Sequence, residues 1–396
     1  SGVSLSLGER PTIASNGDIS YVALLTGEAV TTPNDSGLYV RRVGANELVL
    51  REGQTTILNP IIDFTGHIVS ASAWAVTVET TSGDILFGHW ANSTNTLAYA
   101  GAGGWGTHTV SNISVPSLND AGDLAVAIRT TDGSNEWRIG RTTGDSTLFV
   151  VGESGDTISG LNGAQITSFA GFPVGIDDSG RIASFALVGN QDGQTVITAS
   201  VNDQAIVTID DSGLSLISQT NTHAPNFLTG VMLSDFGYSA ALRQHVNVNN
   251  FGDVVYSSMV AGLGITGADD TALFRTSNAT VSRVVRESSP APGAGTGVTF
   301  ANFPPEDLAA PIYTNANQTF FLQNLGGTGN GNGLFFGNQS GLLAIAYHGQ
   351  QVVGADEGVV IEEIRAFDAN NNNQAIYLAR AGGPGINNTN DGVLFA

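Results

Sequence analysis

Oxygen-bearing side chains recur near the C-terminal end of the sequence in a spacing that suits calcium. Asp368, Asn370 and Asn372 stand at alternate positions, as the first three ligands of a calcium loop do. The glycine and the final bidentate carboxylate of such a loop do not follow them. Asp and Asn are also ordinary turn residues. Two interpretations therefore stay open for Asp368, Asn370 and Asn372: a calcium site, or a turn.

Catalytic motifs are not evident in the sequence. No pair of histidines has the spacing of a metal motif on one strand, no G-x-S-x-G element is present, and no turn carries the S-x-D-x-G-x-x-W pattern of a sialidase. The chain contains no Cys, which excludes disulfides, thiol catalysis and zinc–thiolate sites. We therefore expect a protein that is not an enzyme. The six histidines are His67, His89, His108, His223, His245 and His348.

Two features of the sequence could involve sugars: tryptophans that could bind them and Asn-containing sequons that could carry them. Trp105 stands in a glycine-rich run, residues 101–106, which predicts an exposed loop where the indole could stack on a ligand. Burial between sheets is the alternative for Trp105 and the other three tryptophans. Candidate N-glycosylation sequons begin at Asn34, Asn92, Asn112, Asn278, Asn338 and Asn387, and a seventh, at Asn317, lies in a predicted turn.

The charge balance restricts the partners. The formal net charge is −21, with 12% charged residues and Arg as the only strongly basic residue type. Such a surface repels nucleic acid and anionic lipid, and it suits cations, neutral glycans or other proteins. No apolar run approaches the roughly 18 residues of a membrane span. The sequence begins at Ser1 without a Met or an apolar leader, as a processed export product does, so we expect a secreted or cell-surface protein.

A short repeat predicts the fold. It consists of Pro, an aliphatic residue two positions later, a small polar residue, two further residues and then Gly, as in Pro11–Gly17 and Pro116–Gly122. Gly and Asn tolerate positive φ, so each copy predicts a tight turn between two strands. The copies lie from 49 residues (17 to 66) to 72 residues (180 to 252) apart. The predicted turns are near 17, 66, 122, 180, 252, 317 and 371.

The segments around these turns predict an all-β protein. Short runs rich in β-branched and aromatic residues follow each turn, and two or three more such runs complete each unit. Four antiparallel strands repeated around a ring form a β-propeller. We therefore predict one domain, residues 1–396, with seven four-stranded blades. The segment Val3–Leu7 and the final strand Gly392–Phe395 are predicted to share one blade and so to close the ring.

The turn repeat resembles the NxxGxxAF tandem-repeat family of bacterial "choice-of-anchor" surface proteins. Asn119-Asp-Ala-Gly122-Asp-Leu-Ala-Val matches all but the last position of that motif, and Asp177-Asp-Ser-Gly180-Arg-Ile-Ala keeps its spacing. The resemblance implies an exported protein at the cell surface and carries over no catalytic residue. The sequence departs from the family where a C-terminal sorting signal is expected, because no LPxTG-like motif or basic tail is present.

Three functions follow from these observations. The first is a secreted or cell-surface binding or matrix module that recognises glycan or protein. The second is a structural subunit that polymerises into a filament or sheath, with Val3–Leu7 completing a sheet of a neighbouring copy. The third is a secreted glycan-active enzyme. Fold alone does not decide among them.

Overall fold

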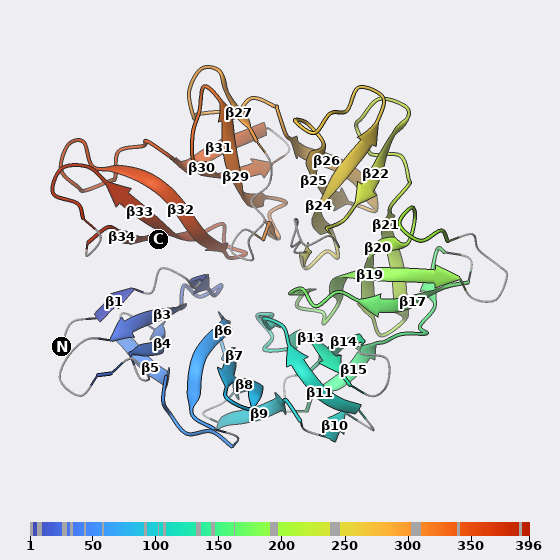
Figure 1. The fold of residues 1–396 in the computed structure, drawn as a ribbon, viewed down its shortest axis with the longest axis horizontal. Coiled ribbons are helices and arrows are strands. Elements are labelled where there is room, and N and C mark those ends of the chain that lie inside the picture. The colour runs from blue at the N-terminus through green and yellow to red at the C-terminus, as the bar shows by residue number, and fades with distance from the viewer. Residues whose placement is uncertain are drawn as a thin grey trace. The chain divides into compact units, whose positions relative to one another are not determined.

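The protein is an all-β protein of the β-propeller class. In the computed structural model every described element is a strand, and the strands form seven sheets that follow one another along the chain (Figure 1). Within the described part of the chain, no helix has the length and apolar character needed to cross a bilayer. The structure describes residues 3–5, 10–25, 30–31, 35–42, 45–57, 59–90, 93–101, 103–105, 108–131, 136–143, 147–161, 163–190, 197–237, 246–301, 310–338, 341–387 and 390–396.

Two compact units make up the chain. The first comprises Ser1–Ile197 and Val207–Leu216, and the second comprises Thr198–Ile206 and Ile217–Ala396. Three complete sheets belong to the first unit. Their strands are β1 (Val3–Leu5), β2 (Thr12–Ile13), β3 (Ile19–Leu25), β4 (Ser36–Arg42) and β5 (Ala45–Arg51); β6 (Ile61–Val69), β7 (Ala73–Thr80), β8 (Gly83–Trp90) and β9 (Ser93–Tyr99); and β10 (Gly103–Trp105), β11 (His108–Ile113), β12 (Ser117–Leu118), β13 (Leu124–Thr130), β14 (Trp137–Arg141) and β15 (Phe149–Gly152).

The fourth sheet contains residues of both units, and the last three sheets belong to the second unit. The fourth sheet consists of β16 (Ile158–Ser159), β17 (Ala164–Phe169), β18 (Gly175–Ile176), β19 (Ile182–Asn190), β20 (Gln204–Asp210) and β21 (Gly213–Gln219). The others are β22 (Val231–Asp235), β23 (Asn247–Val248), β24 (Val254–Gly262), β25 (Thr271–Ser277) and β26 (Thr280–Arg286); β27 (Val298–Phe300), β28 (Ile312–Tyr313), β29 (Thr319–Gly327), β30 (Asn332–Asn338) and β31 (Gly341–Tyr347); and β32 (Val360–Ala369), β33 (Ala375–Gly382) and β34 (Gly392–Phe395).

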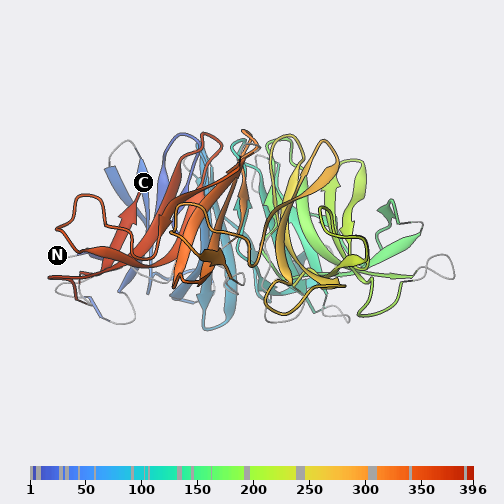
Figure 2. The same ribbon diagram turned by 90° about the horizontal axis from the view of Figure 1, so that it is seen from above.

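The second sheet shows the plan of the repeat most simply. Its strands β6 to β9 pair in chain order, and each pair is antiparallel. The strands of the seven sheets are twisted, as Figure 2 shows. Along β7, which reads AWAVTVET, only Glu79 is exposed, as in a strand covered on both faces. The fourth strand, β9, is polar and mostly exposed or half-buried. The second strand therefore supplies the core, and the fourth strand faces solvent.

The turn repeat is confirmed in six sheets by one hydrogen-bond pattern. In the third sheet the Asn119 N–H donates to the Asp123 carbonyl at 3.0 Å, and the Gly122 N–H donates to the Asn119 carbonyl at 3.1 Å. The Asn119 Oδ1 also accepts the Asp123 N–H at 2.7 Å. The fourth residue of each turn is left-handed, which explains the Gly or Asn there. These residues are Gly17, Gly122, Gly180, Gly252, Asn317 and Asn373.

Two predicted turn positions need correction. Gly66 lies inside strand β6, and the second sheet instead turns at Ser70, whose N–H donates to the Ala73 carbonyl at 2.8 Å. The Pro60–Gly66 segment fits the repeat pattern by composition, but a Cβ at Gly66 would lie 2.6 Å from Val115, so close packing requires this glycine. In the seventh sheet the left-handed residue is Asn373 (φ 61°), two positions after the predicted 371.

A second repeat, not evident in the sequence, connects the fourth strand of five sheets to the sheet that follows. In the loop of residues 155–166 the Gly155 N–H donates to the Ile166 carbonyl, and the Ile166 N–H donates to the Asp156 carbonyl, both at 2.8 Å. The same reciprocal pair of hydrogen bonds closes four other loops. Each loop begins with a left-handed residue; these are Gly53, Gly155, Asn221, Ser288 and Gly349.

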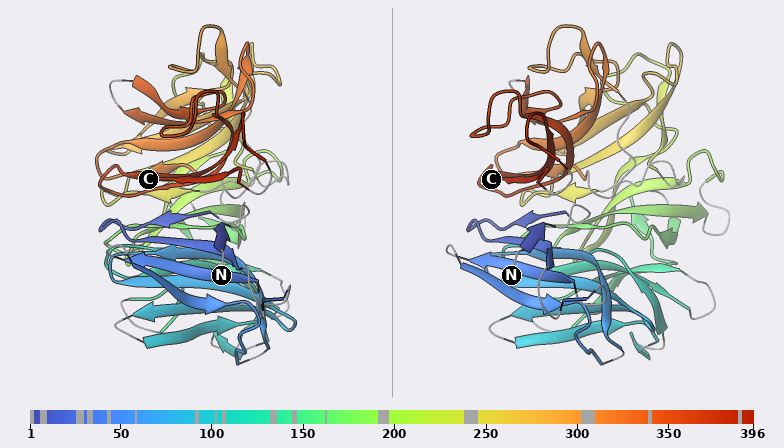
Figure 3. Two further views of the ribbon diagram at one scale, coloured as in Figure 1. Left: turned by 90° about the vertical axis from the view of Figure 1, so that its left-hand side faces the viewer. Right: turned by 60° about the vertical axis from the view of Figure 1, so that its left-hand side comes forward.

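The predicted sharing of one blade by the two terminal strands is wrong. Strand β1 pairs with β3 of the first sheet, Val3 opposite Leu25, and the C-terminal strand β34 pairs with β33. The first sheet, blue in Figure 3, therefore has its own N-terminal strand. In the described part of the chain the seventh sheet contains three strands, and the other six contain at least four.

Candidate functional site

A pocket of about 630 Å³ opens between the loop that follows β15 and the hairpin that joins β20 to β21. This volume is within the range of roughly 300–1,000 Å³ that small-molecule sites have. All of its lining belongs to the first unit. The lining residues are Val151, Asp156, Thr157, Ile158, Ser159, Gly160, Gly163, Ser212, Gly213 and Leu214.

The loop on one side of the pocket has its shape because glycines stand at its left-handed positions. Gly155 has a φ of 92° and Gly160 a φ of 95°, which an L side chain rarely adopts. Between them, the short strand β16 pairs in parallel with β21, Ile158 opposite Leu214. This pairing holds the loop against the fourth strand of the fourth sheet and fixes the width of the pocket.

The pocket has an apolar floor and a polar rim. Ile158 and Leu214 are buried, whereas Thr157, Ser159 and Ser212 are exposed. The Asp156 carboxylate, half-buried, accepts the Glu153 N–H at 2.8 Å through Oδ2. Burial raises the pKa of Asp156, and the backbone hydrogen bond opposes that shift. The rim therefore offers hydroxyl groups and one carboxylate to a ligand.

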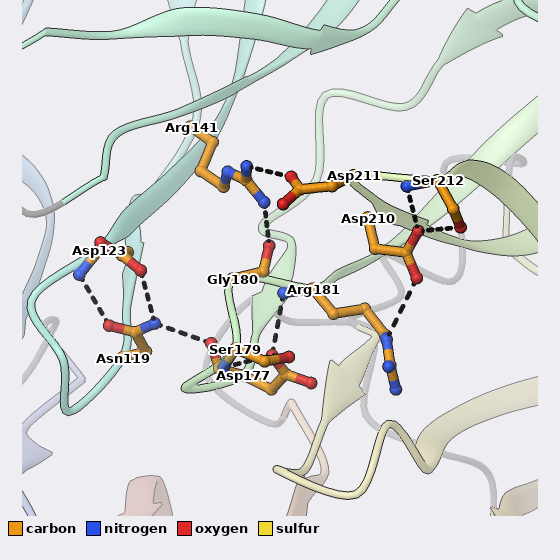
Figure 4. A network of polar contacts seen from close by, with 10 residues as sticks. All are labelled: Asn119, Asp123, Arg141, Asp177, Ser179, Gly180, Arg181, Asp210, Asp211 and Ser212. Atoms are coloured by element: carbon orange, nitrogen blue, oxygen red, sulfur yellow. Dashed lines mark hydrogen bonds and ion pairs between the residues drawn. The ribbon is translucent and has the colours of Figure 1, made fainter.

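Hydrogen bonds hold the hairpin side of the pocket in place (Figure 4). The Asp210 Oδ1 accepts both the Ser212 N–H at 2.8 Å and the Ser212 hydroxyl at 2.5 Å. The Arg181 Nε lies 3.7 Å from the Asp210 Oδ2. The pKa of Asp210 is lowered, chiefly by the Ser212 hydroxyl. Asp210 therefore stays ionised and orients Ser212, which lines the pocket.

A buried arginine links this hairpin to the neighbouring turn. Arg141 donates from Nη2 to the exposed Asp211 carboxylate and from Nη1 to the Gly180 carbonyl, both at 2.7 Å. Its guanidinium also lies over the Phe149 ring, 5.6 Å from the ring centre. The Arg141 side chain is 10% exposed, so its charge is held where neighbouring dipoles and Asp211 compensate it. Arg141 thus fixes the hairpin relative to the 177–181 turn.

The turns of the third and fourth sheets are joined below this arginine. The Asn119 Nδ2 donates to the Asp177 carbonyl at 2.7 Å, and the Asp120 N–H donates to the Asp178 Oδ1 at 2.9 Å. The Asp177 Oδ1 accepts the Ser179 and Arg181 N–H groups, each at 2.9 Å, as Figure 4 shows. The Asn119 and Asp177 side chains stabilise these two turns by accepting main-chain N–H groups. This explains why Asn or Asp stands at the first residue of the turn in the third and fourth sheets.

Trp105, the predicted ligand contact, is the last residue of strand β10, opposite His108. The expected loop at 101–106 is therefore partly a strand, since residues 103–105 pair with β11. The Trp105 side chain lies outside the described residues, so its sugar-stacking role stays a prediction.

The three predicted calcium ligands lie at the end of β32 and in the turn after it. Asp368 and Asn370 are buried. The Asn370 Oδ1 accepts the Asn372 and Gln374 N–H groups, each at 3.0 Å, so Asn370 performs the turn function that the sequence left as one alternative. Among the described residues, no three His, Cys, Asp or Glu side chains form a metal-binding group. Calcium binding at Asp368, Asn370 and Asn372 stays a prediction.

The predicted glycosylation residues fall in different surroundings. Asn112, Asn278 and Asn387 are exposed, and Asn338 is half-buried at the end of β30. Asn34 and Asn92 lie outside the described residues. Asn278 has a φ of 51° in the hairpin between β25 and β26, which leaves its side chain accessible. Whether any sequon is used stays a prediction.

One buried polar cluster was not foreseen from the sequence. The His67 Nδ1 lies 2.8 Å from the Ser20 Oγ, which lies 2.6 Å from the Thr12 Oγ1. The Thr12 Oγ1 also accepts the Val69 N–H at 3.1 Å. All three side chains are buried, so this Ser–His pair is inaccessible to a substrate in this conformation and serves the packing of the first two sheets.

The chain belongs to a family described as "Family of unknown function (DUF7453)", whose profile matches residues 62–396. The more specific resemblance to the NxxGxxAF "choice-of-anchor" family is not confirmed by this match. No curated protein sequence matches the chain.

Several solved structures are similar to the chain at low sequence identity. The β-propeller domain of the Trilobed protease from Pyrococcus furiosus, described as having an open velcro topology, is 9% identical, covers 99% of this chain and 92% of its own, and gives a TM-score of 0.53. The acylaminoacyl peptidase of Pyrococcus horikoshii is 10% identical over 96% of this chain and 49% of its own, with a TM-score of 0.49. An ulvan lyase of polysaccharide lyase family PL25 is 10% identical over 99% and 93%, with a TM-score of 0.41.

The likeness to the Trilobed protease domain shows the fold alone. The chain spans about half the length of the peptidases it matches, and the activities of those proteins are theirs. What this chain can bind therefore depends on the residues that line its own pocket.

Proposed function

We propose that this protein is an extracellular binding module without catalytic activity, and that its pocket takes a neutral, hydroxyl-rich ligand, a glycan. The observation that carries the proposal is the pocket itself, with exposed hydroxyls and one carboxylate above a floor formed by Ile158 and Leu214. Sugars present both an apolar ring face and hydroxyl groups, and a site for them needs the same combination.

The charges around the pocket support a neutral ligand. Asp156 is in the lining, and Asp210 and Asp211 stand beside it in the hairpin. The basic groups near these aspartates, Arg141 and Arg181, are engaged by Asp211 and Asp210. An anionic ligand would therefore meet uncompensated negative charge from Asp156 and from the net charge of −21. Uronates and sulfated sugars should bind more weakly than neutral sugars.

A glycan array with the purified chain tests the proposal. We expect binding to neutral oligosaccharides and weaker binding to their uronate counterparts. Asp156→Asn keeps an oxygen for the Glu153 N–H but removes the charge, and it should weaken binding about tenfold, as loss of one hydrogen bond to a charged group does. Asp203→Asn is the matched control, because Asp203 also accepts a backbone N–H, from Ser200, outside the pocket lining. The proposal would be overturned if no neutral oligosaccharide on the array bound the chain. An equal loss of affinity in Asp156→Asn and Asp203→Asn would also overturn it.

A further inference from the structure

The fifth sheet has a cluster of two arginines and a phenylalanine at its fourth strand, β26 (Figure 1). The Cζ atoms of Arg283 and Arg286 lie 4.5 Å and 5.0 Å from the centre of the Phe227 ring. Phe227 belongs to the loop of residues 221–233, and its ring centre lies 6.2 Å from that of the buried Phe274. The core of the sheet therefore supports the aromatic ring over which both cations lie.

Arg283 has no carboxylate partner in the described part of the chain. Arg286, by contrast, is paired with the Asp269 carboxylate and donates from Nε to the Asp269 carbonyl at 2.9 Å. The Arg283 side chain is half-buried. Burial lowers the pKa of its guanidinium, and the nearby charge of Arg286 adds to that effect. Because both effects disfavour the charged form, an anion next to Arg283 would be stabilising.

The repeat indicates that the fold does not require an arginine at this position. Arg283 is the fourth residue of a seven-residue strand and lies opposite Phe274 of the third strand. In three other sheets the equivalent residue also lies opposite an aromatic residue of the third strand, but it carries no charge. These residues are Leu48, Thr96 and Ala344, opposite Tyr39, Phe87 and Phe335.

Phe227 departs from the repeat in the same copy. Its N–H donates to the Ala224 carbonyl at 3.2 Å, a hydrogen bond that recurs in three other loops. The equivalent donors there are Leu161, Ala294 and Ala355. The loop is held to β26 by a different contact, in which the Asn226 Oδ1 accepts the Arg283 main-chain N–H at 2.9 Å. The Arg283 guanidinium and the Phe227 ring are therefore free for another role, and these are residue types that protein interfaces favour.

Two exposed leucines stand beside this cluster. Leu228 follows Phe227 and is 78% exposed, and Leu263, in the hairpin between β24 and β25, is 83% exposed. Their loops meet where Val231 pairs with Gly262, the residue before Leu263. The surface formed by Phe227, Leu228, Leu263 and Arg283, called the Arg283 surface below, therefore combines apolar side chains with a cation that has no carboxylate partner among the described residues.

We propose that the Arg283 surface binds an acidic segment of a separate polypeptide. A carboxylate side chain of the partner pairs with the Arg283 guanidinium, whose planar set of N–H groups suits two parallel hydrogen bonds to a carboxylate. Apolar side chains on the same face of the partner segment pack on Leu228 and Leu263. Arginine and aromatic side chains are also the types that most often dominate the binding energy of protein interfaces.

The charge close to Arg283 favours such a partner despite the acidity of the whole chain. The net charge of −21 repels acidic segments at long range, but salt screens exposed charges beyond about 8 Å at physiological ionic strength. Asp269 compensates Arg286. Glu287 is buried, and its carboxylate accepts the Thr271 hydroxyl at 2.9 Å. The Arg283 charge therefore remains for the partner.

A peptide with this chemistry tests the proposal. The probe is a labelled, end-capped heptapeptide with a central glutamate, leucines two positions before and after it, and serines elsewhere, because alternate residues of an extended chain lie on one face. It should bind the full chain saturably in a fluorescence-anisotropy titration. One control peptide has glutamine in place of the glutamate, and another has serines in place of both leucines. Both should bind at least about tenfold more weakly, equivalent to about 1.4 kcal/mol.

Arg283→Leu tests the cation directly. The repeat has leucine at the equivalent position, Leu48, so the variant should fold, and it should bind the probe at least about tenfold more weakly. Arg365→Leu is the matched control, because it removes the same charge from another half-buried arginine, which is paired with Glu363; it should leave binding unchanged. Leu228→Ser, at an exposed position, should weaken binding at least about threefold without any change at the arginine.

The proposal would be overturned by absence of probe binding, by equal binding of the three peptides, or by equal affinity of Arg283→Leu and Arg365→Leu. Displacement of the probe by an oligogalacturonate as effectively as by unlabelled peptide would assign the surface to acidic glycans instead. A dimer of the chain that Arg283→Leu dissociates would replace the separate polypeptide by a second copy. Arg283→Leu lies outside the glycan pocket and should keep glycan binding, so failure here leaves the proposed function standing.

Discussion

Acid should destabilise this protein through one histidine. His67 is buried with its Nδ1 against Ser20 and no hydrogen-bond partner for its Nε2 among the described residues. Burial lowers the pKa of His67 to about 3, and the positive charge of Arg10 adds to that effect. An unfolded histidine has a pKa near 6.5. The unfolded state therefore binds this proton more tightly, and stability must fall as the pH drops from about 6.5 toward 3.

The magnitude follows from the two pKa values. Each unit of difference corresponds to about 1.4 kcal/mol, so the full penalty below pH 3 is about 5 kcal/mol. Between pH 7.5 and 4.5 the wild-type chain should lose about 3 kcal/mol through His67 alone. That amount is a substantial part of the roughly 5–15 kcal/mol by which a typical domain is stable.

Urea unfolding at pH 7.5 and 4.5 measures this loss. His67→Gln removes the titrating group, so its loss between the two pH values should be smaller than that of the wild type by about 3 kcal/mol. His89→Gln is the control, since His89 is a partly exposed histidine that stacks on Trp74 with ring centres 5.2 Å apart. Equal acid sensitivity in wild type and His67→Gln would refute the reasoning.

Three substitutions test the supports of the pocket and the packing of the repeat. Arg141→Met leaves the Gly180 carbonyl without its donor and should lower the free energy of unfolding by about 2–3 kcal/mol in urea titrations at pH 7; a loss below 0.5 kcal/mol would contradict the role given to Arg141. Gly155→Ala places a Cβ on a residue with a φ of 92°, and it should cost about 1–2 kcal/mol and weaken glycan binding in the same array, whereas unchanged stability and binding would count against the loop geometry. Gly66→Ala brings a Cβ to 2.6 Å from Val115 and should lower the midpoint of thermal unfolding through a strain of about 1–3 kcal/mol; an unaltered midpoint would show that β6 moves away freely.

The repeat was readable from the sequence where local chemistry sets the conformation. Gly122 and Gly180 are left-handed, and the Asn119 and Asp177 side chains bond to nearby main-chain groups, so residue type alone indicates the turn. The Gly66 prediction was wrong because this glycine is needed for close contact with Val115, which lies 49 residues further along the chain, between strands β11 and β12 of the next sheet. A glycine required for close packing and a glycine required for positive φ look the same in a sequence.

The pocket and the pairing of the N-terminal strand depend on contacts that sequence spacing does not encode. Ile158 lies opposite Leu214, from a loop whose only sequence signal is a left-handed Gly, Asn or Ser followed by an aliphatic or aromatic residue about a dozen positions later. The spacing is 11 or 12 positions in four of the five loops and 8 positions in the loop from Gly53 to Ile61, so the signal is too irregular to stand out in the sequence. The pairing of Val3 with Leu25 also could not be separated by pattern alone from pairing with the last sheet, because both choices satisfy the same alternation.

A calorimetric titration of the strongest array glycan into the wild type and Ser159→Trp tests the central claim most directly. Ser159 is an exposed residue of the pocket lining, and an indole there fills the pocket without entering the core. Ser93→Trp, at an exposed strand start away from the lining, is the matched control. The account predicts binding to wild type and Ser93→Trp, and an affinity at least about a hundredfold lower in Ser159→Trp, equivalent to about 2.7 kcal/mol. Equal affinity in all three proteins would contradict it.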